Sequence, residues 1–398
     1  MHIRRQFLSK LSGTSEIPQG FIPSRALGAH LYDDQGNAYL DLISGFSVMN
    51  LGHSHPQVIQ AIEEQARLYL HTNVYAEHIQ SVQLELAELL CSILPSSLNT
   101  VYYLSSGSET IDAAIKLVRK HSGRSEIIVC SNAYHGSTLA AESLRSDMEH
   151  SRYFRPLLPD IRFIKANCIE DIDLISSNTA AVITEVVQAE AGVIRLENSF
   201  LEALRKKCTD HNVKLVFDEI QTGFGRTGTL FAFQKNEIIP DILLIGKAFG
   251  CGLPLSAVIA SFELLSEFRT QPSLGYISTF GGNPLCCAAA LAGLKVMLKD
   301  NIIGRIPALI NIVKEELGVI SIKDIRIEGM LIALDFDNPE IVWKIIIELY
   351  KKRIMVESFL FNQSALRISP PLIIEEHHLK NACKEIAITV NEIQLQHF

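Results

Sequence analysis

Two charged residues stand at the ends of apolar segments, where their side chains could do chemistry. Lys247 follows the run Asp241-Ile-Leu-Leu-Ile-Gly and precedes a glycine-rich turn, Gly250-Cys-Gly-Leu-Pro254. Because burial disfavours the ammonium ion, a lysine there is pushed toward a neutral, nucleophilic amine of the kind that forms Schiff bases. Asp218 ends a second run, Lys214-Leu-Val-Phe, and a buried carboxylate needs a cationic partner. Pyridoxal phosphate would use both, through its aldehyde and its pyridinium nitrogen.

Neither strand end is decisive alone, because a lysine after a strand is most often solvated and an Asp-Glu pair often caps a helix. A third segment, Ser105-Ser-Gly-Ser-Glu-Thr110, lies between an apolar strand and a helix with one apolar face. Gly107 would let the backbone approach an anion, and the amides near Gly107 and Ser108 would point at it. The alternative is a capping box, with Ser106 as N-cap and Glu109 three residues later.

Composition restricts the class of protein. The chain has 398 residues, 47% of them apolar and 20% charged, and a formal net charge of -8 without long runs of one sign. The sequence has no basic stripe of the kind that would predict a nucleic-acid surface. Glycine and proline interrupt the longest uncharged stretch, so we expect no membrane span. Eight scattered cysteines lack zinc spacing, which predicts reduced thiols, a cytoplasmic location and no metal site.

Strand-like apolar runs alternate with helical patterns from about residue 81 to 298. This alternation predicts an α/β fold with a mostly parallel sheet covered by helices on both faces. Sites in such sheets lie beyond the carboxyl ends of the strands. We predict a large domain at 49–299 and a smaller α+β domain built from both chain ends, 1–48 and 300–398.

Three motifs occur in the order seen in class III aminotransferases, which the chain therefore resembles. They are Ser-Gly-Ser-Glu at 106–109, Asp-Glu-Ile-Gln-Thr-Gly-Phe-Gly-Arg-Thr-Gly at 218–228 and Gly-Lys-Ala-Phe-Gly-Cys-Gly-Leu-Pro at 246–254. Further matching blocks lie at 51–56, 134–136, 185–192, 278–284 and 366–371. The resemblance covers almost the whole chain. It implies a fold type I, pyridoxal-phosphate-dependent transferase that works as a cytoplasmic homodimer.

The resemblance also implies roles for single residues around the cofactor ring. Lys247 matches the lysine that binds the cofactor and carries the proton between its carbon and the substrate carbon. Asp218 matches the partner of the pyridine nitrogen, and Gln221 a neighbour of the phenolic oxygen. Tyr134 is similar to the aromatic residue that stacks on the ring, with a core tyrosine as the alternative. We expect His135 to be structural.

The phosphate group has its own set of matching residues. Gly107 and Ser108 resemble the cradle that binds it. Thr279 resembles the threonine that reaches the phosphate of the neighbouring subunit's cofactor, which makes a homodimer part of the active site.

Five residues are implicated in substrate binding. Arg367 matches the arginine that binds the α-carboxylate of glutamate and 2-oxoglutarate, a task that suits its planar fork. Glu190 matches the glutamate that masks this arginine while the donor binds, although a structural salt bridge is the alternative. Phe46 and Tyr75 predict an apolar aromatic wall, which could equally be core, and Ser278 is a predicted substrate contact.

The loop Tyr134-His-Gly-Ser137 departs from the family pattern. Acetylornithine, ornithine and 4-aminobutyrate enzymes usually carry an arginine at the last position, which meets the donor's carboxylate. Serine cannot supply that charge, so acetylornithine or ornithine remains only one possible donor for ping-pong transfer to 2-oxoglutarate. An aminomutase or racemase is the alternative, and a non-catalytic binding protein is disfavoured by Lys247 and Asp218.

Overall fold

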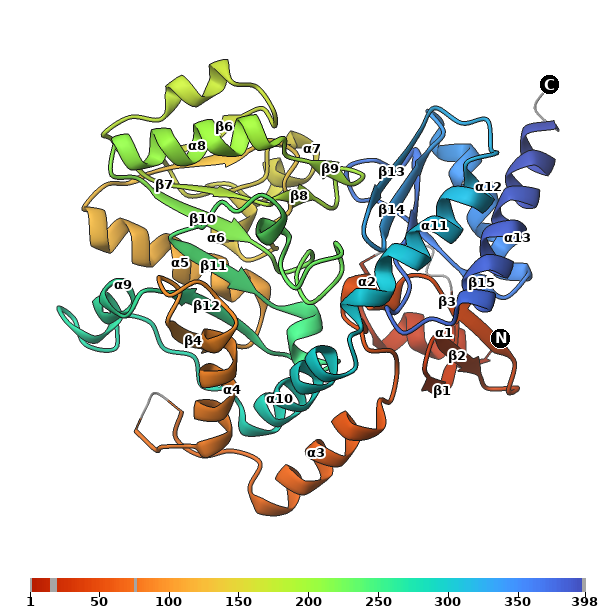
Figure 1. Cartoon of the computed structure of the whole chain (residues 1–398), viewed down its shortest axis with the longest axis horizontal. Helices are drawn as coiled ribbons and strands as arrows, with labels where there is room; N and C mark the ends of the chain where they lie inside the picture. Colours follow the sequence, from red (N-terminus) through yellow and green to blue (C-terminus); the bar gives the residue numbers. More distant parts are fainter. Residues whose placement is uncertain (1, 15–19, 75–76, 396–398) are drawn as a thin grey trace.

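The computed structural model describes residues 2–14, 20–74 and 77–395, and its centre is a seven-stranded sheet (Figure 1). In spatial order the strands are β4 (Thr100–Leu104), β12 (Ser256–Ala260), β11 (Ile242–Ile245), β10 (Lys214–Asp218), β7 (Thr179–Thr184), β5 (Glu126–Cys130) and β6 (Ile161–Ile164). The strands from β11 to β6 are parallel, as the sequence predicts, whereas β12 runs antiparallel to both of its neighbours. The connection from β11 to β12 is too short for a crossover helix, so the chain reverses there.

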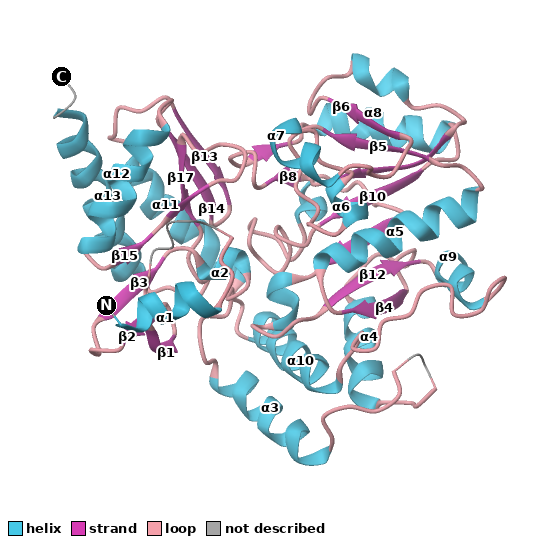
Figure 2. Ribbon diagram, turned by 180° about the vertical axis from the view of Figure 1, so that it is seen from behind, coloured by secondary structure: helices cyan, strands magenta, loops and turns pink. Residues whose placement is uncertain are grey.

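Helices cover both faces of this sheet (Figure 2). On β11, Leu243 and Ile245 pack in one hydrophobic cluster, while Ile242 and Leu244 pack in another on the opposite face. Burial on both sides explains why this strand is an unbroken apolar run. The first cluster contains residues of α4 (Ser81–Ser92), α8 (Asn198–Asp210) and α10 (Pro284–Lys299), and the second contains residues of α5 (Gly107–Ser122).

The two chain ends form two four-stranded sheets beside the large one, where the red and blue strands lie together in Figure 1. One sheet has the order β1 (Pro23–Leu27), β2 (His30–Asp33), β3 (Ala38–Asp41) and β15 (Ile354–Met355). The other is antiparallel, in the order β13 (Asp324–Glu328), β14 (Leu331–Asp335), β17 (Ala365–Ile368) and β16 (Glu357–Ser358). Both ends thus contribute to one α+β region, although the domain boundaries at 48/49 and 299/300 stay a prediction.

Three helices pack on this region. The three are α11 (Ile306–Leu317), α12 (Pro339–Lys351) and α13 (Glu376–Leu395). The other α-helices are α1 (His2–Lys10), α2 (Ser44–Ser47), α3 (Pro56–Leu68), α6 (Leu139–Glu142), α7 (Met148–Ser151) and α9 (Phe262–Leu265). A two-stranded ribbon is formed by β8 (Val187–Gln188) and β9 (Ile194–Arg195).

The remaining elements are single turns of 3-10 helix: η1 (Arg152–Phe154), η2 (Glu170–Leu174), η3 (Ala232–Lys235), η4 (Lys247–Gly250), η5 (Ser266–Arg269) and η6 (Ile303–Arg305). No helix in the described part of the chain is long and apolar enough to cross a membrane. All eight cysteines are free thiols.

One buried guanidinium joins the large sheet's loops to both chain ends. Arg226 is fully buried, and its Nη1 donates hydrogen bonds to the carbonyl oxygens of Met330 at 2.9 Å and Pro370 at 2.7 Å. Its Nη2 donates to Ser44 Oγ at 3.0 Å and to Asn50 Oδ1 at 2.5 Å. Because a buried charge is stable only when it is hydrogen-bonded, these four acceptors fix how the segments meet.

We therefore expect Arg226→Met to lower the free energy of unfolding by roughly 3–5 kcal/mol, because four buried acceptors lose their donor. The urea midpoint followed by circular dichroism measures this loss. Arg195→Met is the matched control, since Arg195 is exposed in a surface ion pair with Glu328 and should change stability by about 0.5 kcal/mol or less. Equal midpoints for the two variants would contradict this role for Arg226.

Candidate active site

The carboxylate at the end of β10 is paired with a buried histidine. Asp218 Oδ2 lies 2.7 Å from His135 Nδ1, and its Oδ1 accepts a hydrogen bond from the Ile220 amide at 3.0 Å. Burial alone would lower the pKa of His135, but the carboxylates of Asp218 and Glu185 raise it above its usual value. The raised pKa favours the imidazolium form, which would stabilise the charge on Asp218, so the histidine that we expected to be structural is in direct contact with a predicted site residue.

The lysine at the end of β11 is close to this carboxylate. Asp218 is paired with Leu244 in the parallel register of β10 and β11, and Lys247 follows three residues later. Lys247 Nζ donates a hydrogen bond to Gln221 Oε1. Burial lowers the pKa of Lys247 to about 8, with Arg367 acting in the same direction and Glu190 opposing it. The lowered pKa therefore increases the fraction of neutral amine, which is the form that acts as a nucleophile.

The predicted phosphate loop begins α5 with Ser106 as N-cap, but the return bond from Glu109 goes to the residue before the cap and not to the cap itself. Ser106 Oγ accepts a hydrogen bond from the Glu109 amide at 3.3 Å, and the Glu109 carboxylate accepts one from the Ser105 amide at 2.8 Å. The loop is therefore a helix cap. Capping leaves the amides of Gly107 and Ser108 at the N-terminus of α5, where backbone N–H groups bind anions.

This loop packs against the segment that carries Tyr134. Ser108 Oγ accepts a hydrogen bond from the Ser137 amide at 3.2 Å. A Cβ at Gly136, which has φ +131°, would lie 2.1 Å from the same oxygen, so only glycine allows this approach. The Tyr134 hydroxyl is hydrogen-bonded to Ser137 Oγ at 3.1 Å. These hydrogen bonds place Ser108, predicted to bind the phosphate, next to the loop of Tyr134, predicted to stack on the ring.

A buried carboxylate supports Tyr134 from behind. Glu185 Oε1 accepts a hydrogen bond from the Tyr134 amide at 3.2 Å, and its Oε2 accepts one from the Ala189 amide at 3.0 Å. Burial raises the pKa of Glu185 to about 7. The sequence indicates no role for Glu185, since its contact with the Tyr134 loop depends on the fold.

Arg367 and Glu190 form the predicted pair. Arg367 Nη2 donates to Glu190 Oε2 at 2.5 Å. Burial raises the pKa of Glu190, but Arg367 together with Lys247 and a backbone amide outweighs this effect and holds the pKa below its usual value. The guanidinium carbon lies 5.0 Å from the Phe46 ring centre and 4.4 Å from that of Phe359. Phe46 is 44% exposed, so it is not a core residue, and Phe359 is a neighbour that the sequence did not indicate.

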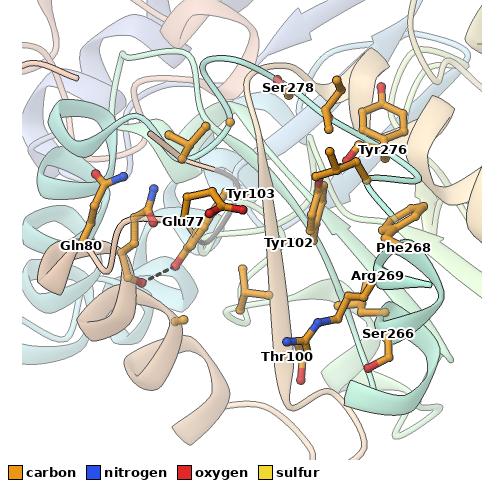
Figure 3. A pocket seen from close by; sticks show the side chains of 18 of the residues that line it. Glu77, Gln80, Thr100, Tyr102, Tyr103, Ser266, Phe268, Arg269, Tyr276 and Ser278 are labelled. Carbon is orange, nitrogen blue, oxygen red and sulfur yellow. Dashed lines mark hydrogen bonds between the residues drawn. The ribbon is translucent and has the colours of Figure 1, made fainter. Parts of the chain in front are cut away.

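Three residues that we predicted to belong to the site lie away from Lys247 and Asp218 or outside the described residues. Ser278 lines a cavity of about 670 Å³ between β4 and residues 262–281, and neither Lys247 nor Asp218 lines it (Figure 3). Within one subunit, the structure therefore does not bring Ser278 to the cluster. Thr279 is exposed on the same loop. Tyr75 falls outside the described residues.

The residues present fit pyridoxal phosphate. An aspartate, a lysine of lowered pKa and a helix N-terminus match its ring nitrogen, aldehyde and phosphate in turn. Gln221 Nε2 and the Nε and Nη1 atoms of Arg367 are buried and make no hydrogen bond to the described chain. Unpaired buried donors of this kind indicate that a ligand completes the site.

The chain matches the family model "Aminotransferase class-III" over residues 12–390. It is 35% identical over 381 residues to the acetylornithine aminotransferase of Methanopyrus kandleri, with 94% of each chain covered. It is 36% identical over 384 residues to that of Methanocaldococcus jannaschii, covering 90% of this chain and 91% of the relative. The solved structure of ornithine aminotransferase from Toxoplasma gondii superposes with a TM-score of 0.91 at 28% identity, covering 99% of this chain and 95% of that one.

The lowered pKa of Lys247 predicts a pH dependence. In the cofactor-free protein, the rate at which an amine-directed ester labels Lys247 should be half-maximal at about pH 8, because only the neutral amine reacts and its fraction rises with pH. Peptide mass spectrometry measures the rate, with exposed Lys206 as the internal reference for the reagent. In Glu190→Gln the midpoint should move to lower pH, since the Glu190 charge raises this pKa. A midpoint above pH 10 would show that burial does not lower the pKa of Lys247.

Proposed function

Because the chain belongs to the class III aminotransferases, which depend on pyridoxal phosphate, we propose that it transfers an amino group from an amine or ω-amino acid to 2-oxoglutarate by a ping-pong mechanism. The expected family, fold type, transaminase class and cofactor are confirmed by the family match and the relatives. One observation carries the proposal: Lys247, of lowered pKa, and Asp218 follow neighbouring parallel strands, and the charges of Arg367 and Glu190 act on the lysine.

The residues of the site divide the chemistry between them. When bound, the cofactor supplies an aldehyde that takes the substrate nitrogen and a ring that accepts electrons from the substrate carbon. Lys247 Nζ, whose pKa is lowered to about 8 by burial, takes the proton from the donor's carbon when neutral and later returns it. Asp218, held by His135, would stabilise a positive charge on the cofactor's ring nitrogen. Gly107 and Ser108 would bind its phosphate, Gln221 would orient its ring oxygen, and Tyr134 would cover its ring.

The Arg367–Glu190 pair supports two binding modes at one site. With the pair closed, Glu190 occupies one edge of the guanidinium, and a donor without an α-carboxylate near Arg367 can bind. When the acceptor's α-carboxylate arrives, it replaces Glu190 and gains the Nε and Nη1 donors that no described group satisfies. The exchange keeps the buried guanidinium paired throughout.

Acetylornithine or ornithine is the first pair of donors to test. The support is that both curated relatives above are named acetylornithine aminotransferases and that a structural neighbour is named an ornithine aminotransferase. Ser137 counts against a simple transfer of these substrates, because it places a neutral side chain at the end of the Tyr134 loop. Phe46, with its exposed ring, supports an apolar wall for a methylene chain.

We further propose that two copies of the chain form a homodimer with shared active sites. The loop that carries Thr279 also exposes Leu274, Ile277 and Phe280, and it borders the large cavity of Figure 3. Exposed apolar side chains gathered around a hollow are typical of protein interfaces. In such a dimer Thr279 would reach the phosphate held by the other subunit, and Ser278 would lie beside it. The cytoplasmic location stays a prediction.

A half-reaction screen tests the function. The purified protein is mixed with acetylornithine, ornithine, lysine, 4-aminobutyrate, putrescine or β-alanine, and the absorption of the lysine-bound cofactor is followed. We expect one donor to remove this band and 2-oxoglutarate to restore it, with one oxo acid formed per amino group transferred.

Lys247→Ala is the control for the screen, because it should keep the fold and the far-ultraviolet spectrum while losing turnover by at least about a thousandfold, as expected when a nucleophile and proton carrier is removed. A variant with ordinary activity would end the assignment. Product isomers without net oxo-acid formation would instead favour an aminomutase or racemase.

Subunit complementation tests the shared site. Light scattering should give about twice the monomer mass of 44.2 kDa. Thr279→Ala should weaken cofactor binding, and mixing it with inactive Lys247→Ala subunits should restore one complete site per mixed dimer. A fully active monomer, or no recovery on mixing despite subunit exchange, would refute the shared site.

A further inference from the structure

A second buried guanidinium lies against the aromatic residues of the site. Arg145, in the loop between α6 and α7, is 8% exposed. Its guanidinium carbon lies 6.0 Å from the ring centre of Tyr134 and 5.2 Å from that of Phe361. Arg145 therefore borders the wall formed by the residue expected to cover the cofactor ring.

Arg145 is held by carboxylates, in the same way as Arg367 is held by Glu190. Its Nε and Nη2 donate to the two carboxylate oxygens of Asp147, at 2.9 and 3.0 Å, and its Nη1 lies 3.5 Å from Glu142 Oε2. Asp147 Oδ2 also lies 2.6 Å from His150 Nδ1. Asp147 would thus keep His150 as a partner if Arg145 turned to a ligand, whereas no second cation pairs with Glu142 among the described residues.

One short segment contacts both guanidinium groups. The Phe359 ring lies on Arg367, and the Phe361 ring, two residues later, lies on Arg145. Between these contacts, the amides of Leu360 and Phe361 donate to the Oε2 and the carbonyl oxygen of Glu190, each at 3.0 Å. The two cations therefore both contact the wall formed by residues 359–361.

A dicarboxylic acceptor needs two such cations. Arg367 accounts for the α-carboxylate, and a second buried carboxylate without a cation would be strongly destabilised. Ser137 cannot provide that charge, because its hydroxyl is neutral and already hydrogen-bonded to Tyr134. Building on the proposed function, we propose that Arg145 binds the distal carboxylate of the five-carbon oxo acid by exchanging Asp147 for it. Arg145 then selects dicarboxylic over monocarboxylic acceptors.

The test compares acceptors of different charge on the cofactor-loaded, full-length protein. In Arg145→Gln, kcat/KM for the acceptor half reaction with 2-oxoglutarate should fall about 10–100-fold, the effect of losing a bidentate charged contact. The value with pyruvate, which has no distal carboxylate, should change less than about twofold if this contact alone is lost. Arg152→Gln is the control, since Arg152 is exposed nearby and stacks on Tyr153.

A binding measurement adds a readout that does not depend on turnover. Calorimetry with glutarate, an unreactive five-carbon dicarboxylate, should give a dissociation constant about 10–100-fold higher in Arg145→Gln than in the wild type. Asp147→Asn removes the competing charge and keeps the shape, so glutarate should bind at least as tightly as in the wild type. Arg145→Lys should fall in between, because lysine keeps the charge without the fork.

The outcomes separate this inference from the function on which it rests. Equal losses with 2-oxoglutarate and pyruvate, or unchanged glutarate binding in Arg145→Gln, would overturn the role of Arg145 while the donor half reaction still supports transamination. Failure of every donor to remove the cofactor band in the wild type would instead count against the proposed function.

Discussion

Burial of charge is the constraint on which this structure depends. Ionised groups that are taken out of water must be paired or neutralised, and the buried groups of the site show both solutions. Asp218 is paired with a histidine, and Arg367 with a glutamate. Lys247 is pushed toward its neutral form. The same demand that makes these groups costly to bury makes them chemically useful, because a partner that can be exchanged for a ligand lowers the cost of binding.

The fold satisfies this constraint by bringing distant segments to one place. Parallel pairing of β10 and β11 sets two strand ends side by side, and the loop after β5 supplies the histidine. Arg226 then fixes the chain ends against this edge through four acceptors. The α+β region built from the two chain ends supplies Arg367 and Phe46. The way this region is attached to the large sheet therefore determines whether the residues predicted to bind substrate are in place.

The sequence predicts those parts of the site that are marked by a pattern of neighbouring residues. Lys247 and Asp218 could be found because an apolar run and a single charged residue mark the end of a buried strand. The contact between His135 and Asp218 could not, because 83 residues separate them and only the loop path decides their distance. Arg145 has no motif of its own, and its position becomes visible only through its contacts with two carboxylates and two aromatic rings. Whether Phe46 lines a pocket or the core was equally open, since an aromatic residue suits both.

The pairing of β15 with β3 has a consequence for how the protein is made. β1 to β3 emerge from the ribosome early, yet their sheet gains its fourth strand only when Ile354 and Met355 have been synthesised. Because domains tend to fold as units during synthesis, the seven-stranded sheet can fold first, while the N-terminal hairpins wait with an unpaired edge. Translation speed over the last part of the message, and chaperones that cover exposed strand edges, are therefore expected to affect the yield of native enzyme.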